Sequence, residues 1–569
     1  MIHTVSGNHS LRHVTSASNF DRSLELNMLE YPLMQASWHE MGKIDIVYIL
    51  VEFSSVFLFV RLFINWIKYI CSLPPGPWGL PLVGYLPFIN GSDLHLQYCE
   101  MAQKYGPIFC ARLGNQLVVV VSDYRIIRDM FRREEFTGRP HIEFTNILDG
   151  YGIVNTEGAL WKDQRRFLHN KLRCFGMTNL SAKNKSLESK IMNEVVTFLR
   201  GLAVRHGTPI NISLPLGMSI SNVICTLLMG MRFHHSEWRF KRFMALIEEG
   251  FKYFAKIALI NYLWPFINYL LRFLPCMQVT RNKISQNRAE MANFFQETID
   301  QHRATFNRNN VRDIVDTYLL EIEQAKEEGR EEQLFEGKNH DRQMQQILGD
   351  LFSAGMETVK TTLEWAVIFM LHYPKAAKAV QRELDEVVGR ARMPTLEDLP
   401  FLPITEATIL EILRKSSIVP LGTTHATTRD TTLNGYAIPA GTQIVPLLHA
   451  VHMDPKLWDE PEVFRPSRFL SSEGKICKPE YFMPFGVGRR MCLGEVLARM
   501  EIFLFFGSLM HTFDLSLPEG ASLPSLRGNA GITISPDPFK VCFLQRDFNV
   551  ECGSNEVTTG GPLRNVGSH

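Results

Sequence analysis

The sequence has almost no excess of charge of either sign. Its 60 lysine and arginine residues nearly balance 59 aspartate and glutamate residues, which leaves a formal net charge of +1. A protein that binds nucleic acid through its phosphates needs a basic surface, and this composition gives no sign of one. The ten cysteines follow no paired spacing, which argues against a disulfide framework and for a reducing compartment.

The sequence also lacks the glycine-rich motifs of nucleotide-binding proteins. It contains neither Gly-x-x-x-x-Gly-Lys-Ser/Thr nor a Rossmann signature, two patterns that hold phosphates on backbone N–H groups. No long internal repeat is present. With 569 residues, the chain is nevertheless long enough for a large core, or for two or more domains.

One cysteine lies in a distinctive loop, Phe485-Gly-Val-Gly-Arg-Arg-Met-Cys-Leu-Gly494. Gly488 and Gly494 flank Cys492 and allow backbone N–H groups to approach its sulfur, as a metal-bound thiolate requires. Arg490 can face a carboxylate while the sulfur faces a metal. The residues that follow the loop predict a helix, whose N-terminal dipole favours an anion. The loop therefore indicates a metal-binding thiolate.

Two simpler interpretations of this cysteine remain open at this point. Most lone cysteines are buried structural residues. A zinc site is the other alternative, since four residues of suitable type occur in one region: His449, His452, Cys477 and Cys492. Zinc ligands usually come in closely spaced pairs, however, and Cys477 and Cys492 are too far apart for such a pair.

The loop resembles the cysteine loop of the cytochrome P450 superfamily, the haem-thiolate monooxygenases, whose pattern is Phe-x-x-Gly-x-Arg-x-Cys-x-Gly. Every fixed position matches, including Phe485. Three further motifs are similar to those of the family and follow in its order: Trp161 with Arg165, the segment Ala354–Thr358 within a predicted helix over 340–372, and Glu411 with Arg414 and Arg468. Taken singly, each could be an ordinary helix-packing or surface feature.

The resemblance runs from about Leu73 to Val541. It implies the cytochrome P450 fold, mainly α with a smaller β-rich region, and haem b as the cofactor. Cys492 would be the axial ligand of the haem iron and would push electron density onto it. The resemblance assigns cofactor binding to Cys492, Arg490, Trp161, Arg165, His425, Phe485, Gly488 and Gly494. The chain has Thr424 where family members often have proline, directly before His425.

The resemblance also implies where the protons and electrons of the reaction come from. Thr358, with Glu357 and water, would deliver protons to bound O2, the co-substrate. Electrons would come from NADPH through a separate protein, NADPH–cytochrome P450 reductase, since the chain has no nucleotide-binding motif of its own. No nucleic acid is expected as a partner.

The N-terminal part predicts a membrane anchor. Residues 1–40 are polar and are expected to be disordered; initiation at Met41 would omit them. Residues 41–72 are expected to form an uncleaved anchor, although Glu52 and Arg61 make a membrane span costly and leave a buried or interfacial helix as the alternative. The basic residues at its end favour a catalytic domain on the cytosolic side of the endoplasmic reticulum membrane. The expected catalytic domain covers 73–548, followed by a polar tail, 549–569.

Other stretches give local predictions. Gly114-Asn115 and Asn434-Gly435 each predict a β-hairpin. The charge-rich segment 321–338 predicts a surface loop. The apolar segment 251–277 is expected to lie partly in the core, with membrane contact as an alternative.

Within the superfamily, the chain resembles the arthropod ecdysteroid 26-hydroxylases in stretches that include residues 74–81, 131–140, 351–362 and 484–494. This implies hydroxylation of the terminal side-chain carbon, C26, of ecdysteroid moulting hormones and allows onward oxidation to the 26-oic acid, which inactivates the hormone. The walls of a steroid pocket are expected from Ile142–Ile153, Ser353–Thr358, Ile418–Thr424 and Asn529–Ile532. A broad-specificity xenobiotic monooxygenase, a haem-thiolate isomerase and a haem-based binding or sensor protein remain alternatives, because the motifs themselves say nothing about steroids.

Overall fold

The computed structural model describes residues 34–91, 93–141, 149–177, 185–258, 262–271 and 273–546. The chain divides into two units, Met1–Cys71 and Ser72–His569. The described part of the first unit belongs to helix α1, Met34–Ser72, whose last residue is the first of the second unit. Its stretch Tyr48–Ser72 is the one helical segment among the described residues that is long and apolar enough to cross a membrane.

Helix α1 begins earlier than predicted. It starts at Met34, inside the segment 1–40 for which no helix was expected; residues 1–33 lie outside the described residues. The first turn contains Met, Gln and Ala, which favour a helix by intrinsic propensity even where no apolar periodicity marks one. The lack of apolar periodicity over residues 34–40 therefore did not exclude a helix there.

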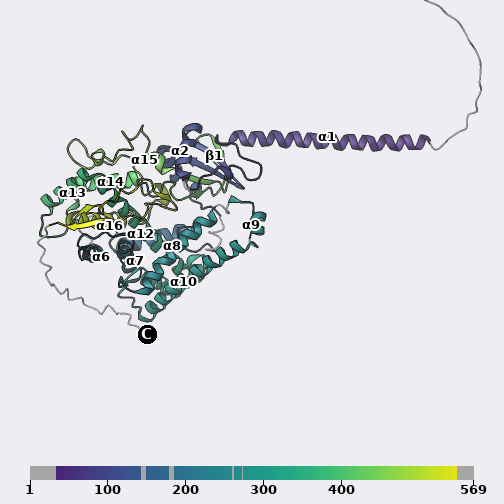
Figure 1. Ribbon diagram of the computed structural model, residues 1–569. Coiled ribbons are helices and arrows are strands. Elements are labelled where there is room, and N and C mark those ends of the chain that lie inside the picture. Colours follow the sequence, from purple (N-terminus) through teal and green to yellow (C-terminus); the bar gives the residue numbers. More distant parts are fainter. Residues whose placement is uncertain are drawn as a thin grey trace, which may run out of the picture. The chain divides into compact units, whose positions relative to one another are not determined.

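The second unit is mainly helical with small sheets, which agrees with the predicted fold class (Figure 1). Its α-helices are α2 Leu94–Tyr105, α3 Tyr124–Arg132, α5 Gly158–Cys174, α6 Lys185–Ala203, α7 Ser213–Met229, α8 Trp238–Ala258, α9 Pro265–Leu271, α10 Pro275–Thr305, α11 Ile314–Glu327, α12 His340–His372, α13 Pro374–Val387, α14 Pro403–Ser416, α15 Leu448–His452 and α16 Glu495–Thr512. Short 3-10 turns are η1 Leu86–Phe88, η2 Glu134–Phe136, η5 Glu331–Gly337, η6 Leu399–Phe401, η7 Pro466–Phe469 and η8 Gly488–Arg490.

The strands are short: β1 Ile108–Leu113, β2 Gln116–Val121, β3 His425–Ala426, β4 Thr431–Leu433, β5 Tyr436–Ile438, β6 Gln443–Pro446, β7 Phe513–Ser516, β8 Asn529–Ala530, β9 Ile534–Ser535 and β10 Cys542–Gln545. The largest sheet has the order β1-β2-β6-β3, and three two-stranded sheets pair β4 with β5, β7 with β10 and β8 with β9. The pairings β1–β2 and β4–β5 are antiparallel, which confirms both predicted hairpins.

Helix α12 is the central element of the catalytic unit. It has 33 residues, as predicted, and at about 1.5 Å per residue it measures roughly 50 Å. Its C-terminal half, Val359–Met370, is buried on every side, because α7, α10, α14 and α16 all pack against it. The main hydrophobic core surrounds this helix.

The predicted surface loop over 321–338 is wrong. Helix α11 continues to Glu327, and a 3-10 turn, Glu331–Gly337, follows. Leu319, Ile322 and Ala325 are buried and recur three residues apart, so they form an apolar stripe beneath a charged face. The density of charge in the sequence concealed this stripe.

A buried ion cluster ties α14 to η7. Arg414 donates from Nε and Nη2 to the two carboxylate oxygens of Glu411, at 2.7 and 2.8 Å, and Arg468 Nε donates to the same carboxylate at 3.1 Å. The side chains of Glu411 and Arg414 are completely buried. Arg414 also donates to the carbonyl of His452, and His452 Nε2 accepts from the backbone N–H of Met483, shortly before the Cys492 loop. The cluster thus helps to hold that loop.

Replacement of Glu411 or Arg414 by alanine should destabilise the protein strongly. Each change strands a buried, unpaired charge, which costs about 3–5 kcal/mol. We expect the urea midpoint, followed by circular dichroism, to fall sharply or the folded protein to be lost. Lys475→Ala, which breaks an exposed pair with Glu473, is the matched control and should change the midpoint little. Equal small effects of all three changes would contradict this account.

Candidate functional site

The loop that carries Cys492 is closed by its own backbone. The N–H of Cys492 donates to the carbonyl of Phe485 at 3.0 Å, and η8 forms the turn between them. Gly488 has φ +77°, and a Cβ there would lie 2.3 Å from the carbonyl oxygen of Phe131. Only glycine fits this close approach. At Gly494, by contrast, a Cβ would meet no protein atom within 4 Å.

The Cys492 thiol is exposed in the protein chain, yet the surrounding protein desolvates it. Desolvation raises its pKa, while the N–H of Gly494 lowers the pKa by donating to the sulfur; the Glu495 charge raises it and the Arg165 charge lowers it. The net direction is upward, so the protein alone does not stabilise a thiolate. A bound metal cation would supply the missing positive charge.

Three arginines from separate segments converge here, and one of them, Arg490, belongs to the loop itself. Arg139 donates to the carbonyls of Val154 and Thr424, both at 2.8 Å. Arg490 donates to the carbonyls of Thr137 and Thr156, at 3.0 and 2.6 Å. Arg165, on α5, donates to the carbonyl of Met491 at 2.5 Å. These backbone contacts fix all three guanidinium groups in place.

Desolvation and mutual crowding lower the pKa values of two of these cations. Desolvation and the charges of Arg139 and Arg165 lower the pKa of Arg490 to about 8, although the Glu157 charge opposes this. Desolvation and the Arg165 charge lower the pKa of Arg139 to about 10, again against Glu157. Within the described part of the chain, none of the three guanidinium groups forms an ion pair. The site is therefore suited to an anionic ligand.

Sequence reasoning missed Arg139. The available signal was the segment Phe131–Pro140, which ends in Gly-Arg-Pro and carries part of the family resemblance. Trp161 was predicted and is buried; the Arg490 guanidinium lies 3.9 Å from the centre of its ring. Such cation–π contacts orient an arginine without neutralising it.

His425 lies near Arg139 and Arg490. Its Nδ1 is 2.7 Å from the carbonyl oxygen of Phe136, so Nδ1 carries the proton and Nε2 is left as an acceptor. Its ring stacks on Phe131, with 4.1 Å between ring centres. Desolvation, together with the charges of Arg139 and Arg490, lowers its pKa well below the usual value. His425 is thus neutral beside the arginines.

Helix α12 carries the predicted motif Ala354–Thr358. The Thr358 hydroxyl donates to the carbonyl of Ala354 at 2.7 Å. A Cβ at Gly355 would lie 2.7 Å from Ile224 Cδ1, so this glycine serves the close packing of α12 on α7. The Glu357 carboxylate is 2.9 Å from the Lys360 ammonium and is not bonded to Thr358.

Two of the expected pocket walls lie side by side. The N–H of Ile534 donates to the carbonyl of Ile418 at 2.8 Å, which joins the β8–β9 hairpin to the segment Ile418–Thr424. Trp365 of α12 donates to the carbonyl of Ile534 at 2.9 Å. The Asn529 amide donates to Asp537, so its N–H groups are partly engaged. Of the expected wall Ile142–Ile153, residues 142–148 lie outside the described residues.

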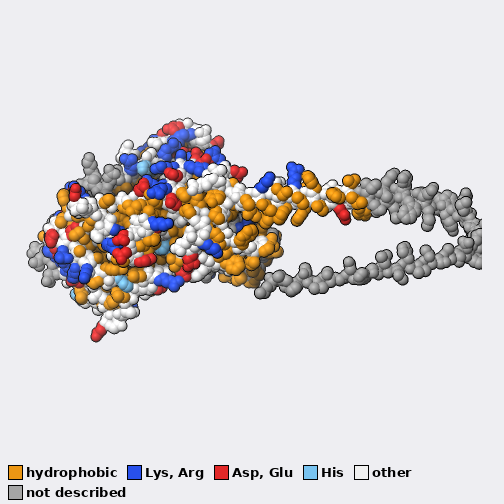
Figure 2. Space-filling model, turned by 90° about the horizontal axis from the view of Figure 1, so that it is seen from above, with side chains coloured by type: hydrophobic (Ala, Val, Ile, Leu, Met, Phe, Trp, Pro, Cys, Tyr) orange, Lys and Arg blue, Asp and Glu red, His pale blue; other side chains and the backbone are white. Residues whose placement is uncertain are grey.

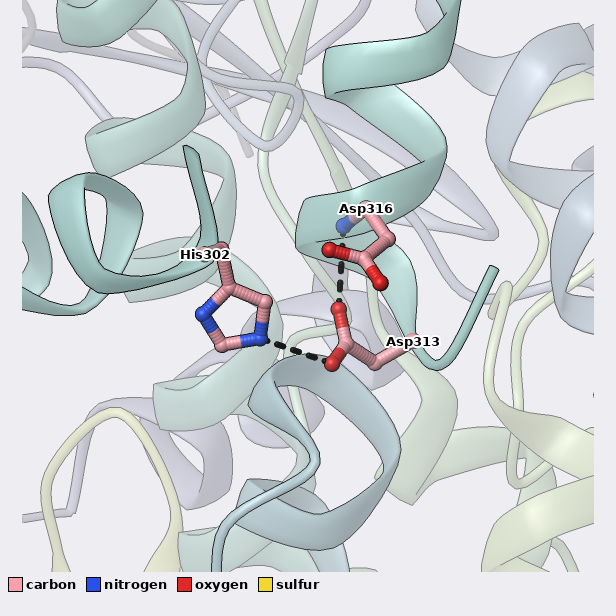
Figure 3. Close-up of side chains that lie close together, drawn as sticks. All are labelled: His302, Asp313 and Asp316. Carbon is pink, nitrogen blue, oxygen red and sulfur yellow. Dashed lines mark hydrogen bonds and ion pairs between the residues drawn. The ribbon is translucent and has the colours of Figure 1, made fainter. Parts of the chain in front are cut away.

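A second group of titratable side chains lies apart, at the junction of α10 and α11 (Figure 3). His302 Nε2 is 2.8 Å from Asp313, and Asp313 accepts from the N–H of Asp316 at 3.0 Å. His302 Nδ1 is also bonded, to the carbonyl of Thr298, and Asp316 accepts from Arg312. This network caps α11 and joins two helices; its ligand atoms are already engaged, so it gives no reason to expect a metal.

The family model described as "Cytochrome P450" matches residues 74–543. The chain is similar to "Cytochrome P450 18a1" of Drosophila melanogaster, with 52% identity over 548 residues that cover 95% of this chain and 99% of that protein. It is also similar to "Cytochrome P450 2U1" of Rattus norvegicus, with 36% identity over 501 residues (84% and 91% covered), and to "Cytochrome P450 2C8" of Homo sapiens, with 34% identity over 478 residues (83% and 94%).

The residues present fit a haem. Three desolvated guanidinium groups suit the two propionates, and the N–H of Gly494 already donates to the sulfur that would bind iron. The open space at Gly494 leaves room beside that sulfur. Arg139, Arg165 and Arg490 would hold the propionates, and Cys492 would bind the iron.

Loss of Arg139 or Arg490 should weaken haem retention. A charge-assisted hydrogen bond contributes about 1.5–3 kcal/mol, so Arg139→Leu and Arg490→Leu should each speed haem loss to a competing haem-binding protein about ten- to a hundredfold. Arg489→Leu is the control, because Arg489 is the exposed neighbour and donates to the carbonyl of Arg132. If all three variants lost haem at the same rate, the arginine cluster would not be the propionate site.

Proposed function

The chain belongs to the cytochrome P450 family of haem-thiolate monooxygenases, and from this premise we propose that its substrates are ecdysteroids, hydroxylated at the terminal side-chain carbon C26. The main support is the 52% identity to the Drosophila protein along nearly the whole of both chains. The resemblance to the arthropod ecdysteroid 26-hydroxylases supplies the substrate class. Onward oxidation to the 26-oic acid would inactivate the hormone.

The proposed cofactor site consists of residues of the Cys492 loop and of the segments that pack around it. Cys492 would bind the haem iron; Arg139, Arg165, Arg490 and Trp161 would hold the propionate edge. Phe485, Gly488 and Gly494 shape the loop around the sulfur. Bound haem supplies the activation of O2 that makes an unreactive C–H bond accessible to oxidation.

Proton supply is proposed for α12. The Thr358 hydroxyl is held by the Ala354 carbonyl, so it can accept a proton on its oxygen and pass its own proton onward. Glu357 is the neighbouring acid that would replace that proton. As with other general acids, its contribution depends on its being able to reach the hydroxyl, directly or through one water.

The terminal methyl group makes a demanding target. Its C–H bonds are stronger than those of the secondary and tertiary carbons nearby, so the pocket must present the side-chain end and keep the rest away. Ser353–Thr358 of α12, Ile418–Thr424 and Asn529–Ile532 would form walls for such end-on binding. The side chains of Thr423 and Thr424 and the side-chain carbonyl of Asn529 would bond steroid hydroxyl groups.

Family members take electrons from a redox partner, and we propose the membrane-bound NADPH–cytochrome P450 reductase for this chain. Helix α1 is the candidate anchor, and we propose the endoplasmic reticulum membrane with the catalytic unit in the cytosol. The catalytic unit also exposes large apolar side chains around α9, including Tyr269, Leu270 and Phe273. Figure 2 shows hydrophobic side chains gathered at this edge of the unit, which would provide a second contact with lipid.

Purified enzyme, reconstituted with reductase and NADPH, should convert 20-hydroxyecdysone to a product that is one oxygen heavier and altered on the side chain. Mass spectrometry of the fragments locates the oxygen, and incubation without reductase is the control. A panel of unrelated lipophiles runs in parallel. If the enzyme oxidised those compounds and left ecdysteroids untouched, it would be a monooxygenase of other specificity and the substrate proposal would fail.

Deletion of residues 1–70 should release the protein from tight membrane insertion and leave weaker, peripheral binding through the exposed apolar side chains near α9. In the deleted protein, Phe273→Glu should then move more of it to the soluble fraction after sedimentation. Val204→Glu, at an equally exposed apolar residue after α6, is the control. Full resistance of the deleted protein to extraction would place the anchor elsewhere.

A further inference from the structure

One face of helix α1 carries a regular apolar seam. Its residues alternate at spacings of three and four, which places them on one side of a helix. The seam consists of Ile49, Glu52, Val56, Phe59, Phe63, Trp66 and Ile70. Its aromatic rings stack along the helix, with 6.3 Å between the ring centres of Phe59 and Phe63 and 5.9 Å between those of Phe63 and Trp66. The seam is thus a continuous apolar surface that one acid, Glu52, interrupts.

The opposite face of α1 is polar. Ser54, Arg61, Asn65 and Lys68 follow that face at spacings of seven, four and three residues. Figure 2 shows basic side chains on one edge of the helix and an acidic one on the other edge. Lipid tails would surround a single anchor helix evenly and give no reason for such a division. The division therefore indicates that the seam and the polar face have different neighbours.

Glu52 lies near the middle of the apolar stretch 46–60. Asp45 precedes this stretch and Arg61 follows it. At about 1.5 Å per residue, Glu52 is roughly 10 Å along the helix from the first and roughly 14 Å from the second. In a hydrocarbon layer about 30 Å thick, its carboxyl is therefore too deep to reach the headgroups on either side.

The Glu52 carboxylate has no hydrogen bond or ion pair among the residues that the structure describes. The Ser55 hydroxyl, one turn further on, donates to the backbone carbonyl of Glu52 at 2.8 Å and not to its side chain. Arg61 lies on the other face of the helix. A carboxyl without a partner is costly in hydrocarbon, so the seam requires a hydrogen-bonding partner at this depth.

We propose that two copies of this chain associate in parallel through the seam, with their Glu52 side chains hydrogen-bonded to each other. All copies insert into the membrane in the same direction, so a second copy presents its own Glu52 at the same depth. A protonated carboxyl has one donor and a free acceptor, and two such groups satisfy each other. The inference rests on the anchor role proposed above for α1.

The rest of the seam suits this partner. Ile49 and Val56 are β-branched and seven residues apart, an arrangement that favours two parallel strands. A single polar residue in an otherwise apolar seam fixes the register of the two helices. Arg61 and Lys68 would point away from the shared surface, where two like charges would otherwise meet.

Energy transfer between labelled copies tests the association. Full-length haem protein, labelled at its C-terminus with a donor or an acceptor fluorophore, is reconstituted into phosphatidylcholine vesicles at increasing lipid dilution. Glu52→Leu should weaken association about three- to thirtyfold, as expected for a hydrogen bond between membrane helices. Glu52→Gln should keep most of it, because an amide also donates and accepts. Ser54→Leu, a polar-to-apolar change on the opposite face, is the control and should behave as wild type.

Two outcomes of this measurement would overturn the proposal. One is equal association of the wild-type protein and Glu52→Leu. The other is a wild-type protein that shows no transfer beyond that of randomly placed molecules, in which case lipid alone covers the seam.

Oxidative cross-linking identifies the shared face. In a Cys71→Ser background, Val56→Cys should give a disulfide-linked dimer in these vesicles on mild oxidation with copper phenanthroline. Leu58→Cys, near the polar face, should stay largely monomeric, and the background protein without either change measures cross-linking through the other native cysteines. Equal cross-linking of the two variants, or more in Leu58→Cys, would contradict the shared seam.

Alkaline carbonate extraction of the same vesicles tests the anchor by itself. Release of the wild-type protein would refute the anchor proposal and this inference with it. Protein that stays inserted but does not associate would refute the association alone. Turnover of ecdysteroids enters neither measurement, so the substrate proposal stands or falls separately.

Discussion

The crowding of three guanidinium groups, of which that of Arg139 is buried and those of Arg165 and Arg490 are half-buried, is the constraint on which the site depends. Arg139, Arg165 and Arg490 come from three separate segments, and the protein holds them with backbone carbonyls in place of carboxylates. Desolvation, together with the charges of Arg139 and Arg165, lowers the pKa of Arg490 to about 8. Carbonyl groups orient a cation without cancelling it, so the arrangement remains unfavourable until an anion binds. A doubly anionic edge, such as that of haem, would relieve it.

The rest of the fold keeps this arrangement rigid. Arg165 is carried on α5. Arg490 lies in the Cys492 loop, and Gly488 allows that loop to pack closely against α3. Further away, the buried Glu411–Arg414 pair reaches the same loop through His452 and Met483. The C-terminal half of α12 is buried and anchors the core. A substitution far from Cys492 can therefore affect the cofactor through packing alone.

The sequence predicted those parts of the site that depend on residue type at fixed spacing. The Cys492 loop, the long α12 and the hairpin at Gly114 all depend on local patterns, and the structure has these elements where they were expected. Arg139 could not be found in this way, because only the folding of distant segments brings it to Arg490. Helix α11 was missed since its apolar stripe is hidden among charges. The orientation of Glu357 was also beyond the sequence, because Lys360 competes with Thr358 for its carboxylate. The assigned roles of the site residues remain proposals.

The central claim is that Cys492 binds the haem iron as a thiolate, and the absorption spectrum of the reduced, carbon monoxide-bound protein tests it most directly. The wild-type protein and a Cys477→Ser variant, which changes an exposed cysteine nearby, should both show the red-shifted band of haem-thiolate proteins. Cys492→Ser should lose that band even where haem is retained. Persistence of the red-shifted band in Cys492→Ser would show that another residue binds the iron and would contradict the account.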